Sequence, residues 1–208
     1  MRSSLIPAAV LAGLFASSSA MGAVNALVDP GFEGTLTFDG PPFVGSWEGF
    51  SAGGTSSSVL STSNPHSGLQ NLQLDMGGTP NVFAGAFQDV DVVSGAMLTY
   101  TGWHMGSYAG DHGIEIRIEW RDSVNNVEIS RTPNFTPTIG TSYEMFTLQG
   151  TAPVGADRAR IIYAVQSFGG AVNGSVSVDD LSVTGIPEPG AALLLGLGGL
   201  GFAVRRRR

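Results

Sequence analysis

The stretch Gly113-Ile114-Glu115-Ile116-Arg117-Ile118-Glu119-Trp120-Arg121 decides the fold of this chain. Its apolar and charged side chains alternate without interruption, and successive side chains of a strand point to opposite faces. One face therefore carries three isoleucines and a tryptophan, and the other carries two glutamates and two arginines. The stretch predicts a β-strand with one face in a core and the other in water.

The rest of residues 24–185 continues as short β-rich runs separated by Gly, Pro, Asn, Asp and Ser, and no segment predicts a helix. We expect further strands at 26–28, 69–76, 87–92, 97–105, 127–129, 143–148, 160–166 and 175–184, with glycine-rich loops at 49–58 and 105–112 and another loop at 131–142. Short, regularly spaced strands of this kind predict one all-β sandwich domain.

Charge and composition exclude several classes of function. Residues 24–185 contain 16 acidic residues and five arginines, a net charge of −11, whereas nucleic-acid binding needs a basic surface. Such a charge suits an extracellular protein or one that uses divalent cations. The chain has no cysteine, which excludes a disulfide scaffold, a thiol nucleophile and zinc-thiolate sites.

Residues 1–23 have the layout of a secretory signal peptide. Arg2 precedes an apolar run from Leu5 to Phe15, and small residues follow at 17–20. Cleavage after Ala20 or after Ala23 fits the small residues that such a site needs. The alternative is a short core helix.

Residues 186–208 consist of Pro187-Glu188-Pro189, an apolar stretch from Gly190 to Val204 and four terminal arginines. As a helix, the apolar stretch would be about 22 Å long, short for a hydrocarbon core of about 30 Å. The arginines stay in the cytoplasm by the positive-inside rule, so residues 24–185 would lie on the outer face of that membrane. We therefore expect a weak, temporary anchor at 190–204.

These three parts together resemble the PEP-CTERM sorting signal of exported bacterial proteins. The resemblance implies that an exosortase, a membrane transpeptidase, recognises Pro187, Glu188 and Pro189 and removes the tail. It also implies a transient inner-membrane anchor, followed by location at the outer surface or in the extracellular matrix of a diderm bacterium that makes extracellular polysaccharide. A plain tail anchor is the alternative.

Short motifs within residues 24–185 follow one another in a characteristic order. From the N-terminus they are 25–33, Trp47, 66–68, 88–92, 152–156 and 178–183. This order resembles the galactose-binding-like jelly roll of carbohydrate-binding modules. The resemblance implies non-catalytic binding of extracellular polysaccharide, although the fold also includes domains that bind no sugar.

Related modules often hold a structural calcium ion where the first and last strands meet. The resemblance places Glu33, Asp179 and Asp180 at the acidic positions of that site, with carbonyl oxygens near Ser67 completing the shell. Calcium binds six to eight oxygen ligands, carboxylates among them. The alternative is that these carboxylates only accept hydrogen bonds in turns.

Sugar binding needs an aromatic ring beside hydrogen-bonding side chains. Trp103 and Tyr108 flank a glycine-rich stretch and are the candidate rings, because Trp47 and Trp120 suit structural positions better. The candidate hydrogen-bonding residues are Gln88, Glu115 and Arg117. The alternative is a solvated sheet face with cross-strand ion pairs.

No catalytic machinery is evident in the chain. Glu115 and Glu119 share a strand face but are about 13 Å apart, beyond the spacing of a glycosidase pair. There is no Gly-x-Ser-x-Gly elbow, and the histidines at 66, 104 and 112 form no triad. Besides polysaccharide binding, the sequence leaves open a purely structural matrix component without a small ligand and, with carboxylates on neighbouring strands, a polysaccharide hydrolase.

Overall fold

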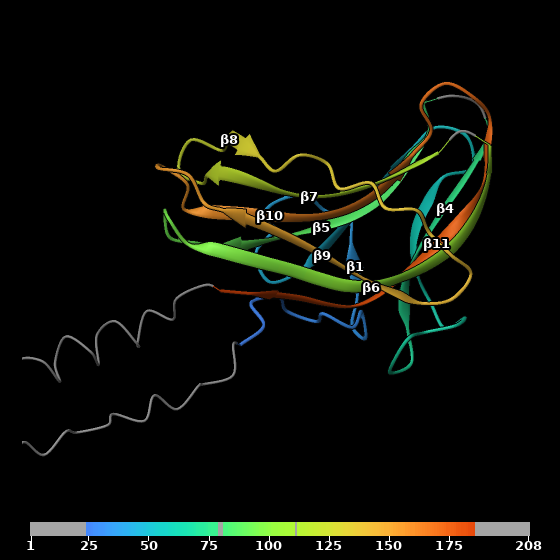
Figure 1. Cartoon of the computed structure of the whole chain (residues 1–208), viewed down its shortest axis with the longest axis horizontal. Helices are drawn as coiled ribbons and strands as arrows, with labels where there is room; N and C mark the ends of the chain where they lie inside the picture. The colour runs from blue at the N-terminus through green and yellow to red at the C-terminus, as the bar shows by residue number, and fades with distance from the viewer. Residues whose placement is uncertain (1–23, 79–80, 111, 186–208) are drawn as a thin grey trace, which may run out of the picture.

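The structure, a computed structural model, describes residues 24–78, 81–110 and 112–185. Two antiparallel-dominated sheets pack face to face (Figure 1), with strand orders β1-β2-β5-β10-β7-β8 and β3-β4-β11-β6-β9. The strands are β1 (Leu36–Thr37), β2 (Trp47–Ala52), β3 (Ser57–Ser61), β4 (Asn71–Gly78), β5 (Phe83–Asp91), β6 (Met97–Gly110), β7 (Gly113–Asp122), β8 (Val127–Arg131), β9 (Glu144–Thr151), β10 (Arg158–Gln166) and β11 (Val172–Thr184). The predicted all-β sandwich is confirmed. The described part of the chain contains no helix long and apolar enough to span a membrane.

The alternating stretch forms β7, which lies between β10 and β8. Its inward side chains, from Ile114 to Trp120, are at most 3% exposed. β10 pairs antiparallel with β7, and this register sets Ile161 opposite Ile118 and Tyr163 opposite Ile116. The prediction that one face of this strand enters the core is therefore confirmed.

Aromatic rings fill the centre of the sandwich. Trp47, Tyr100 and Tyr163 are at most 1% exposed. His104 of β6 is 2% exposed, and its Nδ1 atom lies 2.7 Å from the Tyr163 hydroxyl. Burial lowers the pKa of His104 to about 4, so the core holds a neutral imidazole at pH 7.

Two stretches predicted as glycine-rich loops are largely strand. Residues 49–52 belong to β2, 57–58 to β3 and 105–110 to β6. A Cβ atom at Gly49 would lie 2.6 Å from the Phe38 ring, and one at Gly106 would overlap the carbonyl oxygen of Ser175. The prediction was wrong because these glycines allow close packing inside strands and do not mark turns.

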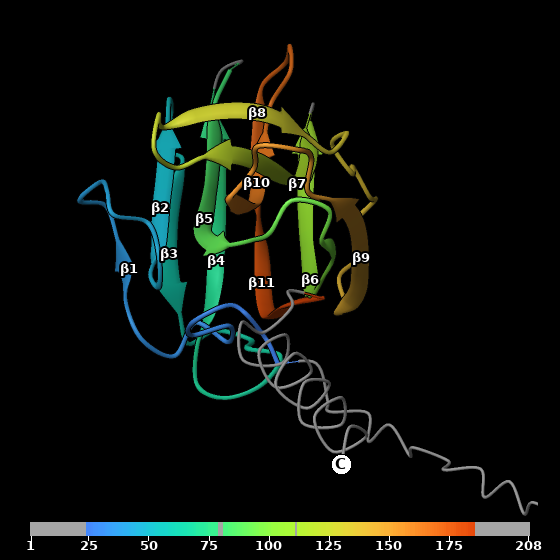
Figure 2. The same cartoon turned by 90° about the vertical axis from the view of Figure 1, so that its left-hand side faces the viewer.

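The predicted strand at 26–28 is irregular chain held against β11. The Ala26 N–H donates to the carbonyl of Val183 at 2.8 Å, and the Asn25 side chain bonds the backbone of Leu181 and Val183. The first and last described residues therefore lie side by side (Figures 1 and 2). The predicted signal peptide 1–23 and apolar helix 190–204 lie outside the described residues.

Candidate functional site

The odd-numbered residues of β7 form a row of alternating charges on the solvent side of the six-stranded sheet, here called the outer face. Arg117 donates to Glu115 at 2.6 Å and to Glu119 at 3.0 Å. Arg121 extends the row at 3.4 Å from Glu119. These four side chains are only 8–16% exposed, so their ion pairs hold each group in a defined orientation.

Further polar side chains join this row from neighbouring segments. Glu115 also accepts hydrogen bonds from Asn134 at 2.8 Å and from Gln166 of β10 at 2.7 Å. The five arginines of residues 24–185 all belong to the described part of the chain. The strand registers place all of them on this one face: Arg117, Arg121, Arg131, Arg158 and Arg160. The other surfaces of the domain therefore carry its acidic excess.

Phenylalanine rings cover the adjoining part of the outer face. Phe83 and Phe87 of β5 point outward on either side of Gly85. The Phe50 ring of β2 occupies the space between them, because a Cβ atom at Gly85 would overlap it. Phe50 lies 6.1 Å from both rings, and Phe43 packs edge-on against Phe87 at 4.9 Å.

Arg160 connects the aromatic part of the outer face to the charged part. Its guanidinium carbon lies 4.1 Å from the centre of the Phe87 ring and 4.7 Å from that of Phe43, a cation–π arrangement. Its nitrogens also bond both carboxyl oxygens of Asp89, at 2.7 and 3.1 Å. Because Asp89 is 4% exposed, this pair fixes the Arg160 guanidinium over the two rings.

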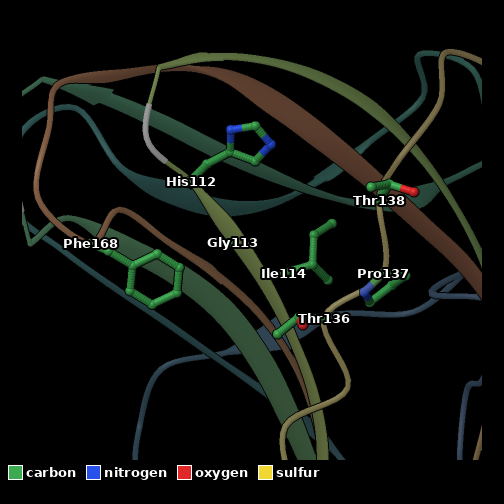
Figure 3. A pocket seen from close by; sticks show the side chains of 7 residues that line it. All are labelled: His112, Gly113, Ile114, Thr136, Pro137, Thr138 and Phe168. Carbon is green, nitrogen blue, oxygen red and sulfur yellow. The ribbon is translucent and has the colours of Figure 1, made fainter.

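A pocket lies at each end of the outer face. The pocket at the Gly113 end has a volume of about 320 Å³, and Figure 3 shows the rings of His112 and Phe168 across from Pro137 and Thr138. The pocket at the Arg121 end measures about 190 Å³ and lies between Phe43, Asp89 and Arg158. The face thus offers rings, guanidinium groups and carboxylates to a ligand that is apolar on some sides and polar on others.

Of the five predicted ligand residues, Glu115 and Arg117 lie on the outer face. Gln88 does not, although its neighbour Phe87 does. It is 0% exposed and points into the sandwich, where its side chain accepts from the Val28 N–H at 2.8 Å and donates to the Val28 carbonyl at 2.9 Å. Gln88 therefore holds the N-terminal segment in place.

The two predicted aromatic platforms lie on opposite sides of the five-stranded sheet. Trp103 faces outward, where the ring of His66 stacks on it at 4.3 Å and 17°. Tyr108 faces inward against the core, with its hydroxyl 3.2 Å from the carbonyl of Leu74. The structure therefore does not bring either ring together with Glu115 and Arg117.

The phenylalanines and Arg160 are not among the residues predicted from the sequence. Only tryptophan and tyrosine were candidate platforms, and the predicted strand starts at Phe87 instead of Phe83. The alternation Phe83-x-Gly85-x-Phe87-x-Asp89, once recognised as one strand, places all four on a single face. That pattern was the available signal.

The predicted calcium ligands all contact the segment 66–70. Glu33 accepts from the N–H groups of residues 69 and 70 at 2.8 and 3.1 Å. Asp179 accepts from the N–H groups of His66 and Ser67 at 2.8 and 3.2 Å. Asp180 contacts the His66 ring at 2.6 Å and the Ser67 hydroxyl at 2.7 Å. These carboxylates therefore join the N-terminal segment, this loop and β11.

The oxygen-rich chemistry of this corner suits calcium. Asp179 is 0% exposed, and burial raises the pKa of its carboxyl while N–H donors oppose that shift. However, across residues 24–78, 81–110 and 112–185 no three His, Asp or Glu side chains are close enough together to hold a metal ion. The carboxylate oxygens of this corner are therefore ligands of the type that calcium binds, but their positions do not surround an ion. Calcium at this corner stays a prediction.

Residues 185–208 match the PEP-CTERM protein-sorting motif. The chain carries a PEP-CTERM sorting motif. The match includes the predicted Pro187, Glu188 and Pro189, and the motif indicates export and sorting to the cell surface. A search of curated proteins found no match to this PEP-CTERM chain.

The body that carries the PEP-CTERM motif is similar to solved jelly-roll domains. The CBM22-1 xylan-binding domain of Paenibacillus barcinonensis Xyn10C matches with a TM-score of 0.54 and 14% identity over 80% of this chain and 97% of that chain. A CBM4 domain matches with a TM-score of 0.52 and 17% identity over 76% of this chain and 98% of that chain. At such identities the likeness shows the fold, which is the jelly roll of carbohydrate-binding modules.

The enzymatically active domain of bacteriophage CBA120 tailspike protein 4 is also similar. It matches with a TM-score of 0.57 and 15% identity over 77% of this chain. The PEP-CTERM chain spans only 21% of the length of that tailspike chain. This likeness, too, concerns the fold.

Proposed function

We propose that this exported protein binds extracellular polysaccharide on the outer face, without catalysis, at the cell surface or in the extracellular matrix. The observation that carries the proposal is the row of phenylalanine rings beside the ion-paired β7 row, with Arg160 joining the two. Jelly-roll neighbours that are carbohydrate-binding modules, one of them described as xylan-binding, support it.

The two parts of the face match the two kinds of surface on a sugar ring. The C–H face of a pyranose can pack on Phe83, while its hydroxyl groups exchange hydrogen bonds with Arg117 and Glu115. Because Arg117 is already held between two glutamates, little side-chain entropy is lost when a ligand binds. The pocket beside Phe168 would receive a further residue of a chain laid along the face.

The absence of catalysis is part of the proposal, and the partners of the glutamates support it. Glu115 accepts from an arginine and two amides, and Glu119 lies beside three arginines. A glycosidase needs a carboxylic acid that can give its proton to the leaving group, whereas the oxygens of both glutamates are occupied by donors from neighbouring side chains. Both glutamates therefore suit hydrogen bonding to a ligand.

Binding of matrix polysaccharide to the purified protein, measured by affinity gel electrophoresis, tests the proposal. We expect Phe83→Ala, which removes a 38% exposed ring, to weaken binding about tenfold, or ~1.4 kcal/mol. Trp103→Ala is the matched control, because it removes a ring from the other sheet. Loss of binding with Trp103→Ala alone would place the site at Trp103 on the other sheet. If no polysaccharide binds, a structural matrix component is favoured. New reducing ends in the polysaccharide would indicate a hydrolase.

For the C-terminal motif we propose recognition by an exosortase and a transient anchor in the inner membrane at 190–204. After removal of the tail, the domain would remain at the outer surface or in the matrix. We also propose a structural calcium ion at Glu33, Asp179 and Asp180, where it would supply positive charge to three carboxylates that pair with none of the arginines in the described residues.

A further inference from the structure

The end of the sandwich where the described chain stops carries three loops with exposed valines at their tips. These are the β5–β6, β7–β8 and β9–β10 connections, and their valines are Val93, Val124 and Val154. The exposed fractions of these side chains are 59%, 87% and 91%. Isolated surface valines need no explanation, but one on each of three connected loops puts three apolar tips at one end of the domain.

Hydrogen bonds hold these three loops together as one surface. The Gly95 N–H donates to the Ala152 carbonyl at 2.8 Å, which joins the first loop to the third. The Ser123 hydroxyl donates to Asp157 at 2.6 Å, which joins the second loop to the third. The valines therefore lie on a fixed platform, here called the loop end.

The C-terminal tail leaves the domain beside the loop end. Gly185, the last described residue, packs against the backbone of Met97, and Met97 is itself 59% exposed. Figures 1 and 2 show β11 ending on the side of the molecule that carries these connections. The apolar stretch starts at residue 190, and five residues span at most about 18 Å. A membrane that holds residues 190–204 therefore lies within that distance of Gly185.

We propose that the loop end rests on the lipid bilayer while the tail is still attached, with Val93, Val124 and Val154 in the interfacial region. The proposal rests on the anchor role of residues 190–204 and is independent of polysaccharide binding. Apolar tips enter the interface, and the tether keeps their local concentration high even if each contact is weak. The carboxylates at this end have partners: Asp122 and Asp157 accept hydrogen bonds from the β7–β8 loop, and Asp91 pairs with Arg158 at 3.0 Å. Such contact would leave the strands rising from the membrane, with the outer face exposed on the side of the domain.

Single-cysteine labelling of the full chain in phosphatidylcholine vesicles tests this contact, since the natural chain has no cysteine. An environment-sensitive fluorophore is attached at Val93→Cys, Val124→Cys or Val154→Cys, and at Ser107→Cys near the far end of β6 as the control. A lipid-borne quencher is then added. A fifth probe, at Leu200→Cys, reports whether the tail is inserted.

We expect quenching at the three loop positions and at the tail, and none at Ser107→Cys. In a Val124→Ser/Val154→Ser background, quenching at Val93→Cys should fall while the tail signal is unchanged. Quenching at the tail alone would overturn the proposal, and so would a tail that does not insert. If the fluorophores on the loops become shielded from water without lipid, and more so at higher protein concentration, two copies of the chain contact each other there. That result would also overturn the proposal. None of these outcomes depends on polysaccharide binding.

Discussion

The guanidinium group of Arg160 lies 4.1 Å from the centre of the Phe87 ring while bonding both oxygens of the buried Asp89. Arg160 therefore connects the aromatic part of the outer face to its charged part. It also contributes to the stability of the sheet, because it pairs with the buried carboxylate of Asp89.

We expect Arg160→Leu to lower the free energy of unfolding by about 3 kcal/mol, because Asp89 would remain buried without its partner. Chemical denaturation measures the loss. Arg158→Leu is the matched control, since it breaks the neighbouring pair with Asp91, whose side chain is 76% exposed. That change should cost at most about 1 kcal/mol. Equal losses for the two variants would contradict this account of Asp89.

His104 should make the protein less stable in mild acid. Its pKa is lowered from 6.5 to about 4 by burial, so between these values the unfolded chain binds a proton that the folded protein does not. The free energy of unfolding should therefore fall as the pH drops from 6.5 to 4, by about 3 kcal/mol in total from this residue. Denaturation curves of the natural protein and His104→Gln should diverge across that window. Parallel curves would show that His104 is not the group responsible.

Gly85 should be intolerant of a side chain. A Cβ atom there would overlap the Phe50 ring and lie 2.8 Å from the carbonyl oxygen of Tyr163. We expect Gly85→Ala to destabilise the protein by about 2 kcal/mol and to displace Phe50 from the outer face. Gly31→Ala is the control, because its nearest neighbours lie at ordinary contact distances of 3.6 and 3.8 Å. Thermal melting compares the two, and a stable Gly85→Ala would mean that Phe50 moves aside readily.

Calcium should raise the melting midpoint if the proposed site at Glu33, Asp179 and Asp180 binds the ion. An ion at one hundred times its dissociation constant adds about 2.7 kcal/mol to the free energy of unfolding. Calorimetry with calcium and with a chelator measures this, and Asp179→Asn should abolish the difference. Asp157→Asn, in a distant loop, should retain it. Identical midpoints in the two buffers would remove calcium from the description of this corner.

Glu188→Ala should prevent processing of the tail in the producing bacterium. The variant should accumulate in the membrane fraction at its unprocessed size, because the residue changed is the acidic member of the sorting motif. Gel mobility after cell fractionation measures this, with Glu144→Ala as a control in the folded body. Normal release of the Glu188→Ala protein would mean that the glutamate is not needed for recognition.

Strand periodicity made β7 predictable, because each of its residues belongs clearly to an apolar or a charged set. The same reasoning failed for Gln88-Asp89-Val90-Asp91, where polar residues fall on both faces and the inward Gln88 bonds Val28. It also failed at Gly49 and Gly106, since the sequence does not show which groups will lie against a glycine. In each case the missing information was a contact between segments far apart in the chain.

The sequence by itself determined the strand-rich body, the division of β7 into two faces and the C-terminal sorting motif. All three depend on neighbouring residues, through alternation or through a short linear pattern. Only the tertiary structure decided that Glu115 and Arg117 share a face with Phe83, Phe87 and Arg160. It also decided that Trp103 stacks on His66 on the outer side of the five-stranded sheet. The reason is physical: alternation assigns a residue to one side of its strand, but strand order and register decide what lies beside it.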